Sequence, residues 1–173
     1  MHLETENTVE EQSKTTREKE AAFSGTERRT QSHAAIHLLV ESRNEMLTLY
    51  GELASLQPFE THQREEVLQK LQQFCEALID YTASAHFQLY RYIDKNKERR
   101  TNVREVADKV YPKIVETTID ILDFNDKYET LEKCVDMQLI ADDLSHVGEV
   151  LAQRTDLEDE VIDALSSKRE KRS

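Results

Sequence analysis

Residues 67–89 read VLQKLQQFCEALIDYTASAHFQL. Apolar side chains recur here at intervals of three and four residues, the spacing that places them on one face of an α-helix. They are Val67, Leu68, Leu71, Phe74, Leu78, Tyr81, Ala85 and Leu89. We expect Thr61 to be the N-cap of this helix and Ile93 to lie near its end. The stretch therefore predicts a long helix that buries one side.

Similar stripes occur on both sides of this stretch. The first runs from Ile36 to Leu53 and stops before Gln57-Pro58, because proline disfavours the helical conformation of the preceding residue. We expect a short helix from about Asn102 to Tyr111-Pro112, where the proline either kinks the helix or starts a new one. A third core stripe follows in residues 114–124 and a fourth in residues 140–165. The third consists of Ile114, Val115, Thr118, Ile121, Leu122 and Phe124.

The composition supports a helical fold. The 173 residues include only 3 Gly and 2 Pro, with 34% charged and 38% hydrophobic residues, which is too little turn chemistry for a β-sandwich or barrel. We predict an all-α protein, an antiparallel up-and-down four-helix bundle with an extra short helix and a flexible N-terminal tail. The expected organisation is a disordered or weakly helical tail at 1–31, a helical-bundle domain at 32–167 and a charged C-terminal tail at 168–173.

The charge balance restricts the partners that the chain can bind. Lys and Arg total 23 against 35 Asp and Glu, so the net charge is −12. This charge disfavours direct contact with nucleic acid and with anionic membranes, and it favours a basic partner. We expect no membrane span and no secretory signal, and a cytoplasmic protein in which Cys75 and Cys134 are reduced thiols.

Charged side chains and one imidazole interrupt the apolar stripes. They are Arg43, His86, Arg154 and Glu158. Because a buried unpaired ion costs several kcal/mol, these groups must be paired or lie where the bundle opens. One interpretation is an internal polar network of His86, Arg154 and Glu158 that fixes the helix register, and the other is that part of this network supports a binding surface. We expect Arg43 and Arg154 to pair with Glu158 or another carboxylate.

A mostly polar stripe runs along the other face of the helix at residues 67–89. It contains Gln73, Asp80, Ser84, Phe87 and Arg91. An aromatic ring with a hydroxyl and a guanidinium one turn away is typical of a protein-binding anchor with a polar rim. The alternative is that a neighbouring helix or the N-terminal segment covers Phe87. Between Asp136 and Asp163, nine acidic residues and one Arg form either a solvated face or a surface that steers a basic partner.

Few residues suggest catalysis or metal binding. His33, His37 and Glu41 share a helical spacing of four, and Asp143-x-x-His146 resembles half of a carboxylate-bundle metal motif. A di-iron site needs more ligands than this. The sequence has no Gly-rich phosphate loop, no G-x-S-x-G and no H-E-x-x-H, so we predict no enzyme and no cofactor. A helical-bundle metalloprotein remains an alternative.

Two segments stand out as motifs: residues 74–90, FCEALIDYTASAHFQLY, and residues 144–151, LSHVGEVL, continued through Arg154 to residues 157–162, LEDEVI. Both resemble the Rsd/AlgQ family of bacterial regulators of the primary sigma factor. Weaker similarity lies in residues 41–47 and in Tyr111-Pro112 with residues 124–128. The resemblance extends over about residues 36–165.

This resemblance implies a helical-bundle anti-sigma factor. Such a protein binds the free primary sigma factor, chiefly its C-terminal promoter-reading domain, and withholds it from core RNA polymerase. The binding positions of the family fall here on Asp80 and Phe87, and we add Ser84, Arg91 and Arg43 as secondary candidates.

The chain departs from the family pattern at several positions. His37-Leu38-Leu39 replaces the usual Asp-Arg-Trp, and Arg91 replaces an acidic residue, so affinity or partner choice is expected to differ. An alternative function is that of an adaptor for another regulatory protein, a phosphotransferase carrier or a stringent-response enzyme, which resembles a secondary role suggested for the family.

Overall fold

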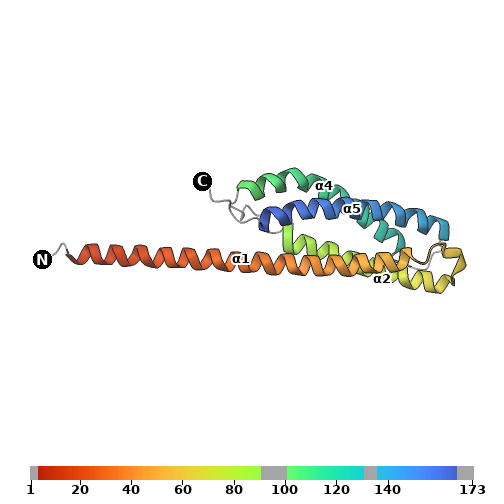
Figure 1. Ribbon diagram of the computed structural model, residues 1–173, viewed down its shortest axis with the longest axis horizontal. Coiled ribbons are helices and arrows are strands. Elements are labelled where there is room, and N and C mark those ends of the chain that lie inside the picture. The colour runs from red at the N-terminus through yellow and green to blue at the C-terminus, as the bar shows by residue number, and fades with distance from the viewer. Residues whose placement is uncertain (1–3, 91–100, 131–135, 167–173) are drawn as a thin grey trace. The chain divides into compact units, whose positions relative to one another are not determined.

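The computed structural model describes residues 4–90, 101–130 and 136–166. The long helices are α1 (Glu4–Ala54), α2 (Arg64–Ala85), α4 (Thr101–Tyr128) and α5 (Met137–Ser166), with a 3₁₀-helix η1 (Phe59–Thr61) and a π-helical turn η2 (His86–Tyr90). These ranges contain no strand, so the predicted all-α class is confirmed. Within residues 36–166, each long helix runs opposite to the one before it (Figure 1). None of the described helices has the length and hydrophobicity needed to cross a bilayer.

Helix α1 belongs to two compact units, Met1–Ala35 and Ile36–Ser173. It begins at Glu4, whereas the sequence predicted the first helix from about Ser32. The many Glu, Lys, Arg and Gln residues of the N-terminal segment favour helix intrinsically, so this segment is helical without an apolar stripe. In the second unit, α1 buries Leu39, Met46 and Leu53 at intervals of seven residues.

Helix α2 begins later than predicted. Its N-cap is Gln63, which makes no capping hydrogen bond through its side chain. Thr61 ends η1, and its hydroxyl donates to the Pro58 carbonyl at 2.7 Å. The prediction of Thr61 as N-cap is therefore wrong, because that side chain closes the preceding turn.

Helix α4 continues through Pro112 without ending. The predicted short helix and the third core helix are therefore one element. Proline removes the hydrogen bond to the carbonyl of Asp108. Both residues are exposed, so water can bond that carbonyl in place of the missing N–H.

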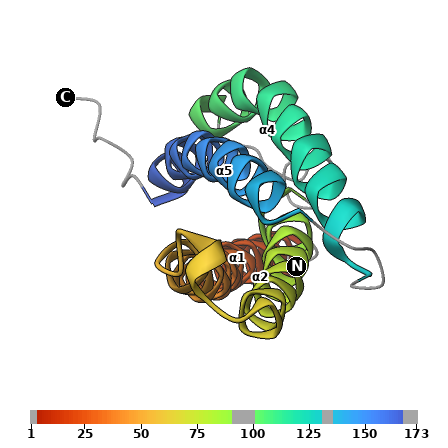
Figure 2. The same cartoon turned by 90° about the vertical axis from the view of Figure 1, so that its right-hand side faces the viewer.

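The helices of the second unit enclose one apolar core. Helix α4 lies along α5 in both views (Figures 1 and 2) and also packs against α2. Edge-on ring contacts link Tyr50 of α1 to Phe74 of α2, at 5.6 Å between centroids, and Phe74 to Phe124 of α4, at 5.8 Å. Cys75 is a buried free thiol beside this cluster, and burial, with Glu129 and Glu76 nearby, raises its pKa to about 12.

Candidate protein-binding site

Phe87 lies at the end of α2, where the backbone changes from α-helix to the π-helical turn η2. The residue is 59% exposed. The His86 ring meets it edge-on, with 5.5 Å between centroids. π-Helical turns often occur at functional sites, and here the turn presents a large apolar ring to solvent. This exposure does not agree with the alternative that a neighbouring helix of residues 36–166 covers Phe87, whereas coverage by the N-terminal segment stays an alternative.

The polar residues of the same stripe lie beside Phe87. Asp80 is exposed and Ser84 is half-buried, and the intervals of four and three residues place both on one side of α2 with Phe87. Arg91 lies outside the described residues. Arg43 instead contacts Asp159 of α5, with 2.9 Å between Nη1 and Oδ1. The structure thus brings together Asp80, Ser84 and Phe87. Arg43 pairs with a carboxylate, as the sequence predicted, and is not part of this group.

A groove of about 480 Å³ runs between α2 and α4, with Phe87 in one wall. Val115 and Leu122 of α4 also line it, and they are 41% and 42% exposed. Their prediction as core residues is therefore wrong. Helix α4 carries two adjacent apolar stripes, and the one that contains Ile121 and Phe124 faces the core. The other lining residues are Ile79, Thr82, Ala83, His86, Tyr111, Ile114, Thr118, Ile119 and Arg154.

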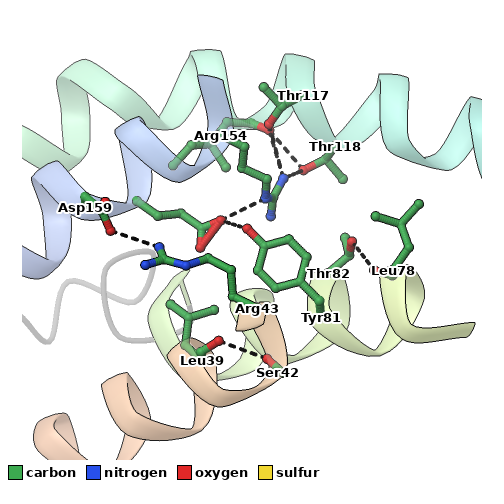
Figure 3. A network of polar contacts seen from close by, with 12 residues as sticks. Leu39, Ser42, Arg43, Leu78, Tyr81, Thr82, Thr117, Thr118, Arg154 and Asp159 are labelled. Carbon is green, nitrogen blue, oxygen red and sulfur yellow. Dashed lines mark hydrogen bonds and ion pairs between the residues drawn. The ribbon is translucent and has the colours of Figure 1, made fainter. Parts of the chain in front are cut away.

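Arg154, which lines the groove, forms the centre of a buried polar network (Figure 3). Its side chain is 1% exposed. Its Nε donates to Glu158 Oε1 at 3.1 Å, and its Nη1 donates to the hydroxyls of Thr118 at 2.7 Å and Thr117 at 3.2 Å. The Tyr81 hydroxyl donates to Glu158 from α2. The network therefore joins α2, α4 and α5 through the middle of the bundle.

Glu158 is the carboxylate of this network and is fully buried. Burial raises its pKa from 4.5 to about 8, and the Asp159 carboxylate adds to the shift, while the Arg43 guanidinium opposes it. Its Oε2 has no hydrogen-bond partner among the residues described. His86 lies apart from this network, since it is exposed in the groove wall, which corrects the prediction of an internal position for it.

The acidic residues of α5 are mostly exposed, but Glu158 is buried and two half-buried ones, Asp143 and Asp159, pair with basic residues of other helices. Asp159 pairs with Arg43, and Asp143 accepts hydrogen bonds from Lys127, at 2.7 Å, and from the Tyr128 hydroxyl. Partial burial opposes ionisation of Asp143, but these hydrogen bonds outweigh it and lower its pKa. The remaining exposed carboxylates give α5 a negative surface.

The residues considered for a metal site do not gather into one. His37 Nε2 lies 4.0 Å from Glu41 Oε2 on the exposed side of α1, whereas Asp143 bonds Lys127. Within the described ranges, no group of three or more His, Cys, Asp or Glu side chains could hold a metal ion.

Comparison with known protein families shows which family the chain belongs to. The sequence model described as regulator of RNA polymerase sigma(70) subunit, Rsd/AlgQ, matches residues 19–166. The chain belongs to the Rsd/AlgQ family. This membership confirms the resemblance carried by residues 74–90 and 144–162.

Individual relatives agree with this membership. A protein named Regulator of sigma D from Yersinia enterocolitica serotype O:8 is 31% identical over 142 residues, which cover 79% of this chain and 83% of that protein. One of the same name from Enterobacter sp. (strain 638) is 31% identical over 140 residues, with 79% and 83% covered. No solved structure matches the chain.

For this member of the Rsd/AlgQ family, the sequence reasoning missed the α4 wall of the groove and the Thr117 and Thr118 contacts with Arg154. A signal for the wall was present. Tyr111, Val115, Ile119 and Leu122 repeat at intervals of four, four and three residues, beside the core stripe rather than within it. When the apolar band of a helix is too wide for one neighbouring helix to cover, part of the band stays exposed to solvent.

Proposed function

We propose that this chain is an anti-sigma factor. It binds the primary sigma factor, mainly the C-terminal promoter-reading domain, and sequesters it from core RNA polymerase. Membership of a family of sigma(70) regulators supports this proposal. The observation that carries it is the 59% exposure of Phe87 on a helix face that also bears Asp80 and Ser84.

Phe87 has the properties of a central anchor. Burial of an aromatic ring in a partner removes a large apolar area from water, at about 25 cal/mol per Å². Asp80 and Ser84 beside it can form hydrogen bonds at the edge of the contact, where polar residues usually lie in protein interfaces. An interface built in this way takes much of its affinity from a few such residues.

The charge of the chain fits such a partner. A promoter-reading domain is basic because it contacts DNA phosphates. The net charge of −12 attracts a basic domain and increases its rate of association. If the sigma surface that this chain covers is also the surface that contacts polymerase, binding excludes polymerase and sequesters the sigma factor.

The test is direct binding of the purified chain to the C-terminal domain of the primary sigma factor, measured by isothermal titration calorimetry. We expect a 1:1 complex with at least micromolar affinity, and we expect Phe87→Ala to weaken it by about 1–3 kcal/mol. Leu139→Ala is the matched control, because Leu139 is 40% exposed on α5 and does not line the groove.

Two results would decide against the proposal. One is the absence of a complex at low salt and micromolar concentration. The other is a complex that leaves the sigma factor free to bind core polymerase in a competition assay, since binding without sequestration contradicts an anti-sigma role.

A further inference from the structure

We propose that the groove between α2 and α4 receives one amphipathic helix of the partner, with its apolar side against both walls and basic side chains along both rims. This proposal rests on the proposed function, because the helix belongs to the sigma factor. It adds α4, which the polar stripe of α2 did not indicate, to the binding surface.

The α4 wall is apolar and open to solvent. Tyr111, Val115, Ile119 and Leu122 are 37%, 41%, 55% and 42% exposed. Contiguous exposed apolar side chains of this size are uncommon on a surface that binds nothing. All four lie on one side of the helix, at intervals of four, four and three residues.

The α2 wall faces the same groove. It consists of Ile79, Ala83 and Phe87, at intervals of four residues. The small side chain of Ala83 is exposed between two large ones, which leaves space in the middle of this wall. The floor contains Ile114 and the hydroxyl-bearing Thr82 and Thr118.

The dimensions suit a short helix. The α4 wall runs from Tyr111 to Leu122, a rise of eleven steps of 1.5 Å or about 16.5 Å, which is about three helical turns. A β-strand would gain little here, because both walls are helices whose backbone groups already bond within the helix. The backbone N–H and C=O groups of a helix form hydrogen bonds within the helix, so a helix needs only side-chain contacts from the groove.

The rims determine the charge of the occupant. Exposed carboxylates flank both walls: Glu76 and Asp80 on α2, and Glu116 and Asp123 on α4. Helical spacing places each of them within a turn of a groove residue. An apolar stripe between two basic flanks is therefore complementary to this groove, whereas an acidic helix would be repelled.

The test compares variants of the full chain for binding to the C-terminal domain of the primary sigma factor. Ile119→Ser removes the most exposed apolar side chain of the α4 wall, and Ala83→Trp fills the space in the α2 wall. Both sites are exposed, so we expect unchanged circular dichroism and thermal unfolding. We expect each variant to raise the dissociation constant at least about tenfold, whereas the control Leu139→Ser changes it less than about twofold.

The rim charges need a separate measurement. Asp123→Lys is expected to weaken binding and to reduce its salt dependence, since it replaces an attractive charge with a repulsive one. Asp163→Lys, an exposed position on α5 outside the groove, is the matched control for net charge.

The outcomes separate this proposal from the proposed function. If wild-type protein binds the sigma domain and Phe87→Ala weakens binding, but Ile119→Ser and Ala83→Trp do not, the groove proposal fails and the proposed function stands. If wild-type protein does not bind at all, both fail. If sedimentation shows a homodimer that Ile119→Ser dissociates, the occupant is a second copy of this chain and the groove proposal is overturned. Should Ala83→Trp not fold, Ile119→Ser alone decides.

Discussion

Gly148 shows how one residue sets the distance between two helices. A methyl group at this position would lie 2.1 Å from Tyr50 Oη and 2.8 Å from Tyr50 Cζ. Tyr50 has little freedom to move, because its hydroxyl donates to the Leu144 carbonyl at 3.1 Å and its ring contacts Phe74. Because Gly148 of α5 has no side chain, the Tyr50 side chain of α1 fits against α5.

We expect Gly148→Ala to lower the free energy of unfolding by about 1–3 kcal/mol, because Tyr50 must leave its position. Urea denaturation measures this loss. The control is Gly51→Ala, where a methyl group would meet nothing within 4 Å. There the helical preference of alanine should raise the free energy of unfolding by as much as about 1 kcal/mol. Equal shifts of the two midpoints, or a rise of the midpoint for Gly148→Ala, would contradict the close approach.

Glu158 makes stability depend on pH. Burial raises its pKa from 4.5 to about 8, so between these values the folded chain holds a proton that the unfolded chain releases. Stability from this group is therefore fully present below pH 4.5 and is lost as the pH rises toward 8. The slope is at most about 1.4 kcal/mol per pH unit.

We expect Glu158→Gln to flatten the decline of stability between about pH 5 and pH 8, as measured by urea unfolding at several pH values. Glu160→Gln, at an exposed position on the same helix, should leave the decline in place. An equally steep decline in Glu158→Gln would show that another group titrates in this range.

At the scale of elements, α4 is the helix that sequence reasoning divided. Pro112→Ala restores a hydrogen-bond donor inside a continuous helix, and alanine is the better helix former. Part of this gain is offset, because alanine also gives the unfolded chain more freedom. We expect the urea midpoint to rise by the equivalent of about 1 kcal/mol, and a clear fall would indicate that the proline ring itself contributes to packing.

The apolar stripes predicted most of the core. Leu39, Phe74, Leu78, Ile121 and Leu144 are buried as their spacing indicated. Spacing identifies the apolar side of a helix, but it does not tell which neighbour covers that side. For this reason Val115 and Leu122, which continue the apolar band of α4, were assigned to the core and instead line the groove.

The candidate site was predictable in part. Phe87 on a polar face was evident from the sequence, because an aromatic ring among hydrophilic residues breaks the helical pattern. The cap at Gln63 and the contacts of Thr117 and Thr118 with Arg154 were not, since they depend on chain turns and on side chains from helices far apart in the sequence. Such contacts leave no periodic signal.

At the scale of the whole molecule, the net charge of −12 should control how partner affinity responds to salt. We expect an increase from about 50 mM to about 300 mM NaCl to weaken binding of the sigma domain at least tenfold, mainly through slower association. Stopped-flow or surface plasmon resonance measurements would give the association and dissociation rates separately. Phe87→Ala should keep the same salt slope, because it removes no charge, and a wild-type affinity that ignores salt would contradict electrostatic steering.

Cys75 is buried in the same core as the aromatic cluster, and its high pKa keeps the sulfur in the thiol form at neutral pH. Alkylating reagents react with the thiolate and need access to it, so the closed bundle gives them neither. Labelling of Cys75 in native buffer therefore requires α2 to separate transiently from its neighbours. The rate of this labelling measures how often the bundle opens.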